Sequence, residues 1–354
     1  MELQKLKLTH FRSYQKEEAF FSSGLNCIEG ANGSGKSNLL EAIHLISTGK
    51  SFRTHRLYDL IKHSEAGFEL EANFLKEGIS HSLRVFFSKE GRKIFYNDTA
   101  HSSFLPLLGI LPSILLCPED ISILSGSPAE RRRFLDLHLA QIDKLYVYHL
   151  GRYQRALKQR NFLLKKKDEK GLLPWEQLMA ASASYIIEKR IETIEYLQEP
   201  SKRLVLQFSR QKEDFTMEYE SSLLQNASSY AEQWERNRKK ELETGTTLLG
   251  PHRDDVLFFL KGQDVKTFCS EGQKRCCLAA LRFSEWERLK SILDSPPLFG
   301  IDDFGVHLDE DRSSLLKEPL LSMGQVFITA PSFQANESSH VLHALDGTLR
   351  NRRQ

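Results

Sequence analysis

A glycine-rich stretch near the N-terminus has the residue types and spacing of a phosphate-binding loop. Residues 30–37 read GANGSGKS, so Gly30, Gly35, Lys36 and Ser37 fit the pattern G-x-x-x-x-G-K-[ST]. Glycines let backbone N–H groups turn toward phosphate oxygens, the lysine reaches the β- and γ-phosphates, and the hydroxyl ligates Mg²⁺. The residues expected to surround the phosphates are Gly30, Ala31, Asn32, Gly33, Ser34, Gly35, Lys36 and Ser37.

The residues on either side supply the elements that such a loop needs. Residues 25–28 form a short apolar run consistent with a strand, and Leu39, Leu40, Ile43 and Ile46 recur at helical spacing after the loop. The helix N-terminus adds the positive end of its dipole to the site. The alternative is a chance glycine-rich turn, and the flanking strand and helix argue against it.

A second motif lies near the C-terminus, in the segment PPLFGIDDFG. An apolar strand that ends in Asp302 can hold Mg²⁺ directly or through water, and Asp303 can orient or polarise an attacking water. Gly300 departs from the pattern, because glycine weakens a central strand. The alternative is an ordinary strand capped by acidic turn residues, and the phosphate-binding loop favours the metal site.

A third segment, residues 268–275, reads FCSEGQKR and precedes a strong helix. Ser270 and Gly272 offer a hydroxyl and a close-approach glycine at the helix start, which makes a second anion-binding end. From chemistry alone a plain N-cap at Ser270 is the preferred interpretation. The position of the segment, about 30 residues before the Asp302 strand, favours the anion site.

The whole chain has the composition of a globular protein without membrane segments. It has 354 residues, which suits two lobes, with 40% hydrophobic and 27% charged residues. No apolar run approaches the length that spans a membrane, and the N-terminus shows no signal-peptide core, so the cytoplasm is expected. The five cysteines form no C-x-x-C pair and are expected to be free thiols without a zinc site.

The character of the sequence changes twice along the chain. Residues 1–118 are mixed strands and turns, residues 119–243 are dominated by helical periodicity, and residues 244–354 return to loops and strands. The expected fold class is therefore α/β, with a discontinuous P-loop ATPase head and an inserted, mainly helical lobe. A net charge of +2 says nothing about partners, but residues 131–170 hold twelve Lys or Arg against four Asp or Glu.

The three motifs occur in the order found in the ABC-type ATPases that act on DNA, the SMC/Rad50/RecF group, with Leu308 and Asp309 following as in that group. Four further stretches narrow the resemblance: LISTGKSFRTHRL, CPEDISILSGSPAERRRFLD, YQRALKQRNFLLK and GPHRDDV. Together they closely resemble the RecF family of bacterial recombination mediators, over nearly the whole chain.

This resemblance implies a Rad50-head-like fold that binds ATP and Mg²⁺ and forms an ATP-dependent homodimer. Lys36, Asp302 and Asp303 would be catalytic, Ser37 and Asp302 would hold the metal, and Ser270 and Gly272 would touch the γ-phosphate of the other subunit. Hydrolysis would be slow and would time release from DNA, so the ATPase is a switch rather than a metabolic enzyme.

The resemblance also implies partners. RecF proteins bind single-stranded, gapped or junction DNA, act with RecO and RecR in replication and gap repair, help RecA replace single-strand-binding protein, and support SOS induction. Three positions depart from the group. Glu271 stands where glutamine is usual and would repel a γ-phosphate. Ser37 replaces the commoner threonine with the same hydroxyl chemistry, and Ala330 stands where many ABC ATPases have histidine.

One helix of the inserted lobe is a candidate DNA contact. Treated as a helix, residues 150–166 place one apolar stripe inward and a positive side outward. The apolar stripe comprises Leu150, Tyr153, Leu157 and Leu164, and the positive side comprises Arg152, Arg155, Gln159 and Lys166. The DNA contacts expected from this side are Arg152, Arg155 and Lys166, and the alternative is an ordinary solvated surface.

Three other features have two open interpretations each. Residues 250–255, GPHRDD, are either a lobe contact or nucleotide sensor, or a structural salt-bridge loop. The Arg131–Arg133 run either binds phosphates or makes ion pairs on a helix face. Phe11 and Arg12 are candidates for contacts with adenine or phosphate.

Three rival functions are weaker. A transporter ATPase subunit would need a membrane partner, and the RecF-like stretches argue against it. A small-molecule P-loop kinase has no use for the Ser270–Gly272 helix start. A head with a long coiled coil would need a longer insert with sustained heptads.

Overall fold

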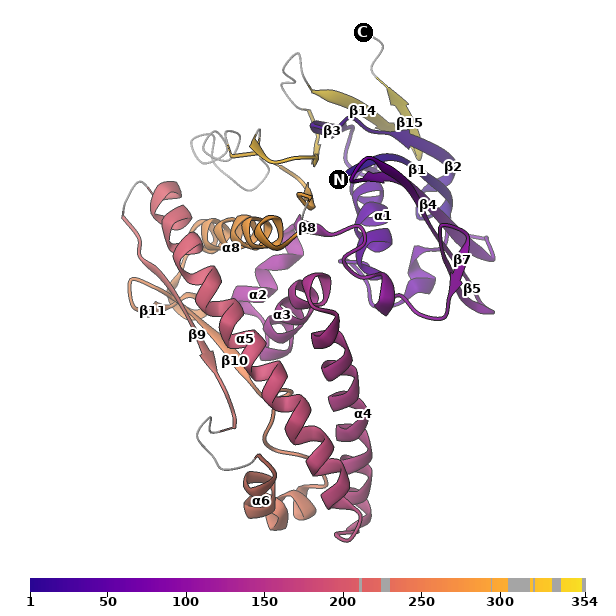
Figure 1. Ribbon diagram of the computed structural model, residues 1–354. Coiled ribbons are helices and arrows are strands. Elements are labelled where there is room, and N and C mark those ends of the chain that lie inside the picture. The colour runs from indigo at the N-terminus through magenta and orange to yellow at the C-terminus, as the bar shows by residue number, and fades with distance from the viewer. Residues whose placement is uncertain are drawn as a thin grey trace. The chain divides into compact units, whose positions relative to one another are not determined.

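The chain divides into two units, described here from a computed structural model (Figure 1). The structure describes residues 1–209, 212–223, 230–293, 295–304, 319–320, 322–332 and 339–351. The first unit comprises Met1–Ile121 and Glu271–Gln354, and the second comprises Ser122–Ser270, an insertion within the first. The insertion runs beyond the expected end at residue 243, because the strand that follows pairs with a strand of the insert.

The first unit contains an antiparallel sheet with the strand order β2-β1-β4-β5-β6-β7. Its strands are β1 (Glu2–Phe11), β2 (Tyr14–Phe20), β4 (Gly67–Lys76), β5 (Ile79–Ser88), β6 (Gly91–Tyr96) and β7 (Thr99–His101). Alternating apolar residues and the turn before Gly91 predict β4, β5 and β6, and these strands are confirmed.

A second, mainly parallel sheet of this unit has the order β15-β14-β3-β13-β12-β8. Its strands are β3 (Leu25–Glu29), β8 (Ser113–Leu116), β12 (Leu298–Ile301), β13 (Val326–Ala330), β14 (His340–Leu345) and β15 (Thr348–Asn351). All pairs are parallel except β14 with β15. The apolar runs in PPLFGIDDFG and GQVFITA predict two buried strands, and both are confirmed as β12 and β13, neighbours in this sheet.

Two long helices enclose the parallel sheet. Helix α1 (Lys36–Thr48) contacts strands of both sheets and therefore lies between them. Helix α8 (Glu271–Ile292) contacts the parallel sheet through Phe283, whose ring lies 5.0 Å from that of Phe299 on β12. The next residue, Gly300, faces α1. The unit is completed by the short helices η1 (Leu57–Leu60), η2 (Leu105–Leu107) and η3 (Pro118–Asp120).

The second unit combines helices with a small antiparallel sheet of order β11-β10-β9. Its strands are β9 (Phe215–Glu220), β10 (Asp255–Leu260) and β11 (Gln263–Asp264). Its helices are α2 (Ile121–Ser125), α3 (Pro128–Ile142), α4 (Lys144–Lys166), α5 (Leu172–Phe208), α6 (Tyr230–Thr244) and α7 (Val265–Phe268). Helices α4 and α5 pack along each other (Figure 1). None of the helices in the described part of the chain has both the length and the apolarity needed to cross a membrane.

A buried ion network connects the helices of the second unit. The Arg160 guanidinium of α4 is 0% exposed and donates to Glu176 on α5 at 2.8 Å and to Glu241 on α6 at 2.6 Å. It also donates to the Thr247 hydroxyl at 2.8 Å, and Arg238 binds the second oxygen of Glu176 at 2.6 Å. One cation thus fixes the positions of three helices around it.

Removing this cation should destabilise the second unit strongly. In Arg160→Met, two buried carboxylates lose their shared partner, so the free energy of unfolding should fall by about 3–5 kcal/mol. Urea unfolding followed by circular dichroism measures the change. Lys158→Met, an exposed position on the same helix, is the control and should stay within about 0.5 kcal/mol of the wild type. Equal stabilities of the two variants would contradict a structural role for Arg160.

Candidate functional site

The predicted phosphate-binding loop lies between β3 and α1, and the expected strand–loop–helix arrangement is confirmed. Gly30, Gly33 and Gly35 have φ angles of 157°, 82° and 112°, values that favour glycine. A Cβ at Gly35 would also lie 3.0 Å from the hydroxyls of Ser13 and Tyr14. The loop therefore needs glycine at this position for both conformation and space.

Helix α1 begins with its backbone N–H groups available to a ligand. Its N-cap, Gly35, supplies no side-chain cap, and the first turn holds no acidic residue. The Tyr14 hydroxyl donates to the Gly35 carbonyl at 2.9 Å and holds the turn from the other side. Together with the helix dipole, this arrangement makes an anion-binding end.

The Lys36 side chain folds back over the loop. Its Nζ donates to the carbonyls of Gly30 and Ala31, both at 2.9 Å, and the residue is only 5% exposed. An ammonium group has three N–H donors, so a third donor remains beyond these two bonds. The Ser34 hydroxyl is buried in the same loop and has no hydrogen-bond partner among the described residues. These donors fit a phosphate group held in the loop.

Asp302 lies directly after β12 and is brought together with Ser37 of the loop. The residue is 8% exposed, its carboxylate accepts a hydrogen bond from the Thr329 hydroxyl at 2.7 Å, and the Ser37 side chain lies close enough to affect its ionisation. Burial raises the pKa of the Asp302 carboxyl, and the negative charges of Asp303 and Glu119 raise it further. A divalent cation beside Ser37 and Asp302 would offset both effects. This donor set therefore fits Mg²⁺.

Asp303 follows in a left-handed backbone conformation, with φ of 54°. Its N–H donates to the Thr329 hydroxyl at 2.8 Å, so one threonine supports both acidic residues. The sequence does not single out Thr329. The available signal is a threonine inside the apolar strand β13, a position where a hydroxyl needs a partner.

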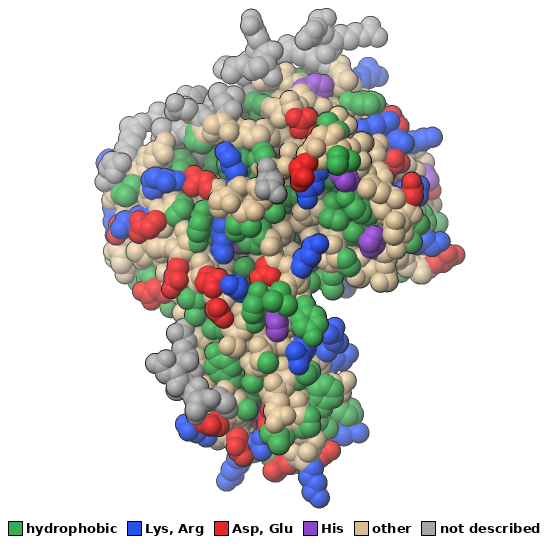
Figure 2. All heavy atoms as spheres, in the orientation of Figure 1, with side chains coloured by type: hydrophobic (Ala, Val, Ile, Leu, Met, Phe, Trp, Pro, Cys, Tyr) green, Lys and Arg blue, Asp and Glu red, His purple; other side chains and the backbone are tan. Residues whose placement is uncertain are grey.

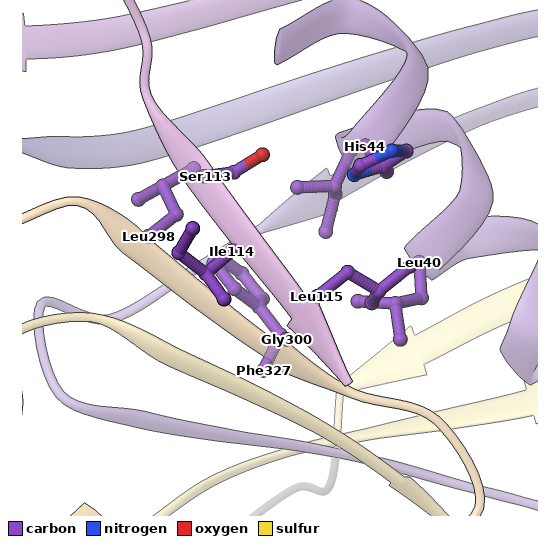
Figure 3. A pocket seen from close by; sticks show the side chains of 9 residues that line it. Leu40, His44, Ser113, Ile114, Leu115, Leu298, Gly300 and Phe327 are labelled. Carbon is purple, nitrogen blue, oxygen red and sulfur yellow. The ribbon is translucent and has the colours of Figure 1, made fainter. Parts of the chain in front are cut away.

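Gly300 has a packing reason that the sequence does not reveal. A Cβ at this position would lie 2.9 Å from the Cδ1 atoms of both Leu40 and Leu115. Figure 3 shows these side chains around Gly300 in a small, largely apolar pocket below α1. The glycine therefore lets the loop helix approach the strand that carries Asp302.

The N-terminal pair Phe11 and Arg12, predicted as candidates for contacts with adenine or phosphate, makes contacts within the first unit. Phe11 is fully buried and packs edge-to-face on Phe68. Arg12 makes two hydrogen bonds of 2.8 Å to the buried carboxylate of Glu41 on α1. Arg12 thus anchors the loop helix to the first strands.

The third segment forms the start of α8, as expected. Ser270 is exposed and directly precedes the helix, and Gly272 is half-buried in its first turn. The Glu271 carboxylate is 67% exposed and forms an ion pair with Lys274 at 3.7 Å. The negative charge of Glu271, at a position where related ATPases usually have glutamine, therefore has the Lys274 ammonium beside it. Leu308 and Asp309 lie outside the described residues.

The outward face of α4 has the predicted orientation. Tyr153 and Leu164 are buried, while Arg155 and Lys166 are exposed and Arg152 is half-buried. The remaining predicted positions agree: Leu150 and Leu157 pack against the core, and Gln159 is exposed. The basic side chains of this face are thus available to a ligand.

Residues 250–255 make the ion pairs that the structural interpretation of this loop predicts. The Arg131 guanidinium binds the Asp255 carboxylate at 2.6 and 2.8 Å, and Arg132 donates to the Asp254 carbonyl. His252 contacts the Tyr153 hydroxyl at 2.7 Å, and burial lowers the pKa of its imidazole to about 4. Arg131 and Arg132 therefore stabilise the fold of the second unit.

The family model and the curated relatives that match this sequence point to the same family. The RecF/RecN/SMC N-terminal domain family matches residues 2–348. The DNA replication and repair protein RecF of Protochlamydia amoebophila is 44% identical over 336 residues, covering 93% of this chain and 94% of that protein. The RecF of Bacillus velezensis is 34% identical over 347 residues, covering 94% of each.

Solved structures agree with the sequence relatives. The recombination mediator protein RecF-ATP of the RecFOR pathway matches with a TM-score of 0.91 and 29% identity, covering 99% of this chain and 98% of that one. An Smc head domain from Pyrococcus furiosus matches with a TM-score of 0.57 at 18% identity and shares the fold alone. The chain therefore belongs to the RecF family, and its fold is that of an ABC-type ATPase head with an inserted lobe.

Proposed function

We propose that this protein is an ATP-switched DNA-binding protein of replication and recombinational gap repair. The observation that carries the proposal is the position of the phosphate-binding loop beside the acidic strand end. Strands β3, β13 and β12 are parallel neighbours, and the Ser37 side chain lies close enough to Asp302 to lower the pKa of its carboxyl. The names of the relatives, DNA replication and repair protein RecF, support the biological setting. ATP binding in a RecF of known structure supports the choice of nucleotide.

In this proposal the loop holds ATP and the strand end holds Mg²⁺. The Gly30–Ser37 backbone and the third Lys36 donor bind the phosphates, and Ser37 and Asp302 hold the metal. When bound, Mg²⁺ neutralises charge on the phosphate oxygens. Asp303, one residue further, orients the attacking water.

The switch is a homodimer that assembles when ATP is bound. Ser270 is exposed at the start of α8, where its hydroxyl can meet the γ-phosphate held by a partner subunit, with Gly272 allowing close approach. The Lys274 ion pair lessens the repulsion that Glu271 would exert there. Slow hydrolysis separates the subunits and releases DNA.

The DNA partner is single-stranded, gapped or junction DNA, bound partly through Arg152, Arg155 and Lys166. RecR and RecO are the protein partners, and through them the protein helps load RecA and supports SOS induction. The RecFOR pathway of the solved relative supports this assignment.

The deciding experiment measures DNA affinity without nucleotide, with ADP, and with a slowly hydrolysed ATP analogue. Tight binding with the analogue alone is expected, together with a dimer in light scattering. Affinities that do not depend on the nucleotide would refute the switch.

Lys36→Ala should weaken ATP binding at least about tenfold, because the phosphates lose a charge-assisted donor. Isothermal titration calorimetry gives the affinity, and thermal melting checks that the variant is folded. Lys89→Ala, exposed in the turn between β5 and β6, is the matched control and should bind ATP like the wild type. If Lys36→Ala bound ATP as tightly as the wild type, the loop would not be the nucleotide-binding site.

The two acidic residues should have separable effects. Asp302→Asn should weaken nucleotide binding only when Mg²⁺ is present, since the metal contact is lost. Asp303→Asn should leave affinity within about twofold and slow hydrolysis at least about tenfold. Affinity with and without Mg²⁺, and single-turnover hydrolysis, distinguish them. Identical behaviour of the two variants would contradict this division of roles.

Charge reversal on α4 should weaken DNA binding without affecting ATP. Arg152→Glu combined with Arg155→Glu removes two cations that would neutralise DNA phosphates and so release counterions from the DNA. Both the affinity for DNA and its dependence on salt concentration should therefore fall. Fluorescence anisotropy over a range of salt concentrations measures both. Lys239→Glu with Lys240→Glu, exposed on α6, is the charge-matched control. If the DNA affinity of the variant depended on salt as steeply as that of the wild type, this face of α4 would not be the DNA contact.

A further inference from the structure

The outward face of α4 carries exposed aromatic rings among its basic side chains. Tyr148 and Phe162 are 54% and 51% exposed. Advancing 100° per residue places them within about 80° of arc together with the basic residues of this face. We call this surface the aromatic–basic stripe; it comprises Tyr148, Arg152, Arg155, Gln159, Phe162 and Lys166.

These rings are not part of the core of the second unit. The inward side of α4 is already filled by Tyr146, Tyr153 and Leu164, each at most 1% exposed. Burying an aromatic side chain contributes about 1.5–3 kcal/mol, so two half-exposed rings on one helix forgo stabilisation within the folded chain. They are therefore available to a ligand that can cover them.

Both rings are held in defined surroundings. The Lys166 ammonium lies 4.4 Å from the centroid of the Phe162 ring. The Tyr148 ring makes an edge contact with His149 at 5.3 Å, and His149 stacks at 4.6 Å on Tyr185 of α5. The Tyr148 end of the stripe is thus a small cluster of rings that spans two helices.

The charge of α4 selects the class of ligand. From Lys144 to Lys166 the helix contains no Asp or Glu. The basic side chains of α4 are Lys and Arg, and burial and the Arg152 guanidinium lower the pKa of His149, which disfavours a further charge there. Figure 2 shows basic and hydrophobic side chains interspersed on the part of the second unit where Figure 1 places α4. A polyanion with flat apolar faces complements this surface.

We propose that the aromatic–basic stripe binds single-stranded DNA, with bases stacked on Tyr148 and Phe162 and phosphates on Arg152, Arg155 and Lys166. The proposal rests on the DNA binding proposed above and deepens it by naming the form of DNA. Base faces are accessible in a single strand and covered in a duplex, and aromatic stacking is the usual sequence-tolerant contact to single strands. The rings are 14 residues apart, about 21 Å along the helix, so they would receive bases several nucleotides apart.

The test compares a single-stranded thymidine oligonucleotide with a duplex of equal length, both with the slowly hydrolysed ATP analogue. Tyr148→Ala combined with Phe162→Ala should lower single-strand affinity at least about tenfold and duplex affinity less than about twofold. The salt slope should stay unchanged, because no charge is removed. Leu173→Ala with Tyr196→Ala, exposed on α5, is the control for lost apolar surface.

A second readout reports on stacking itself. In Tyr148→Trp, the emission of the new indole should be quenched by the single strand and not by the duplex. The wild type, whose tryptophans are Trp175, Trp234 and Trp286, provides the background. Thermal melting should show that the variants are folded.

Three outcomes would overturn the proposal: single-strand affinity of the double variant equal to that of the wild type, equal losses on both forms of DNA, or an indole emission that single strands do not change. A partner other than single-stranded DNA would give the first of these. If DNA affinity did not depend on ATP, the proposed nucleotide switch would be refuted instead. The comparison of single-stranded with duplex DNA would still show whether the aromatic–basic stripe binds single strands.

Discussion

The predicted phosphate- and metal-binding residues of the first unit meet at one buried carboxylate, that of Asp302. Its burial favours the neutral acid, and the neighbouring negative charges favour it further, so the site is organised around a group that lacks a cation within the described chain. Ser37 and Thr329 reach it because β3, β12 and β13 run parallel and bring their carboxyl ends to one edge. Gly300 contributes by its missing side chain, since it allows α1 to pack closely on β12.

Helix α4 of the second unit carries one buried and one exposed arginine that differ in their surroundings. Arg160 is enclosed by carboxylates and sets the packing of three helices, whereas Arg155, five residues earlier, is exposed with no acidic residue on its helix. The internal network connects the inner side of α4 to its neighbouring helices, while basic side chains of its outer face are exposed. A stable inner side and an unsatisfied outer side are what a binding surface on a rigid element requires.

The sequence predicts the parts of the site that are local and misses those that join distant segments. The Gly30–Ser37 loop is recognisable because its function fixes consecutive residues, and helical periodicity correctly orients α4. The Arg12–Glu41 pair and the support from Thr329 are not predictable, because each partner is an ordinary residue until the fold brings it to the other. The end of the insertion at Ser270, rather than 243, depends on the pairing of β10 with β9, which no local pattern encodes.

The pairing of β3 has a consequence for the synthesis of the protein. The strand that carries the phosphate-binding loop has two neighbours in its sheet, β13 and β14, and both come from the last part of the chain. A ribosome therefore makes the loop early but must translate almost the entire message before the loop has a sheet to support it. Nascent or truncated chains that contain the full nucleotide motif would lack the framework that shapes it, so ATP binding becomes a property of the finished polypeptide.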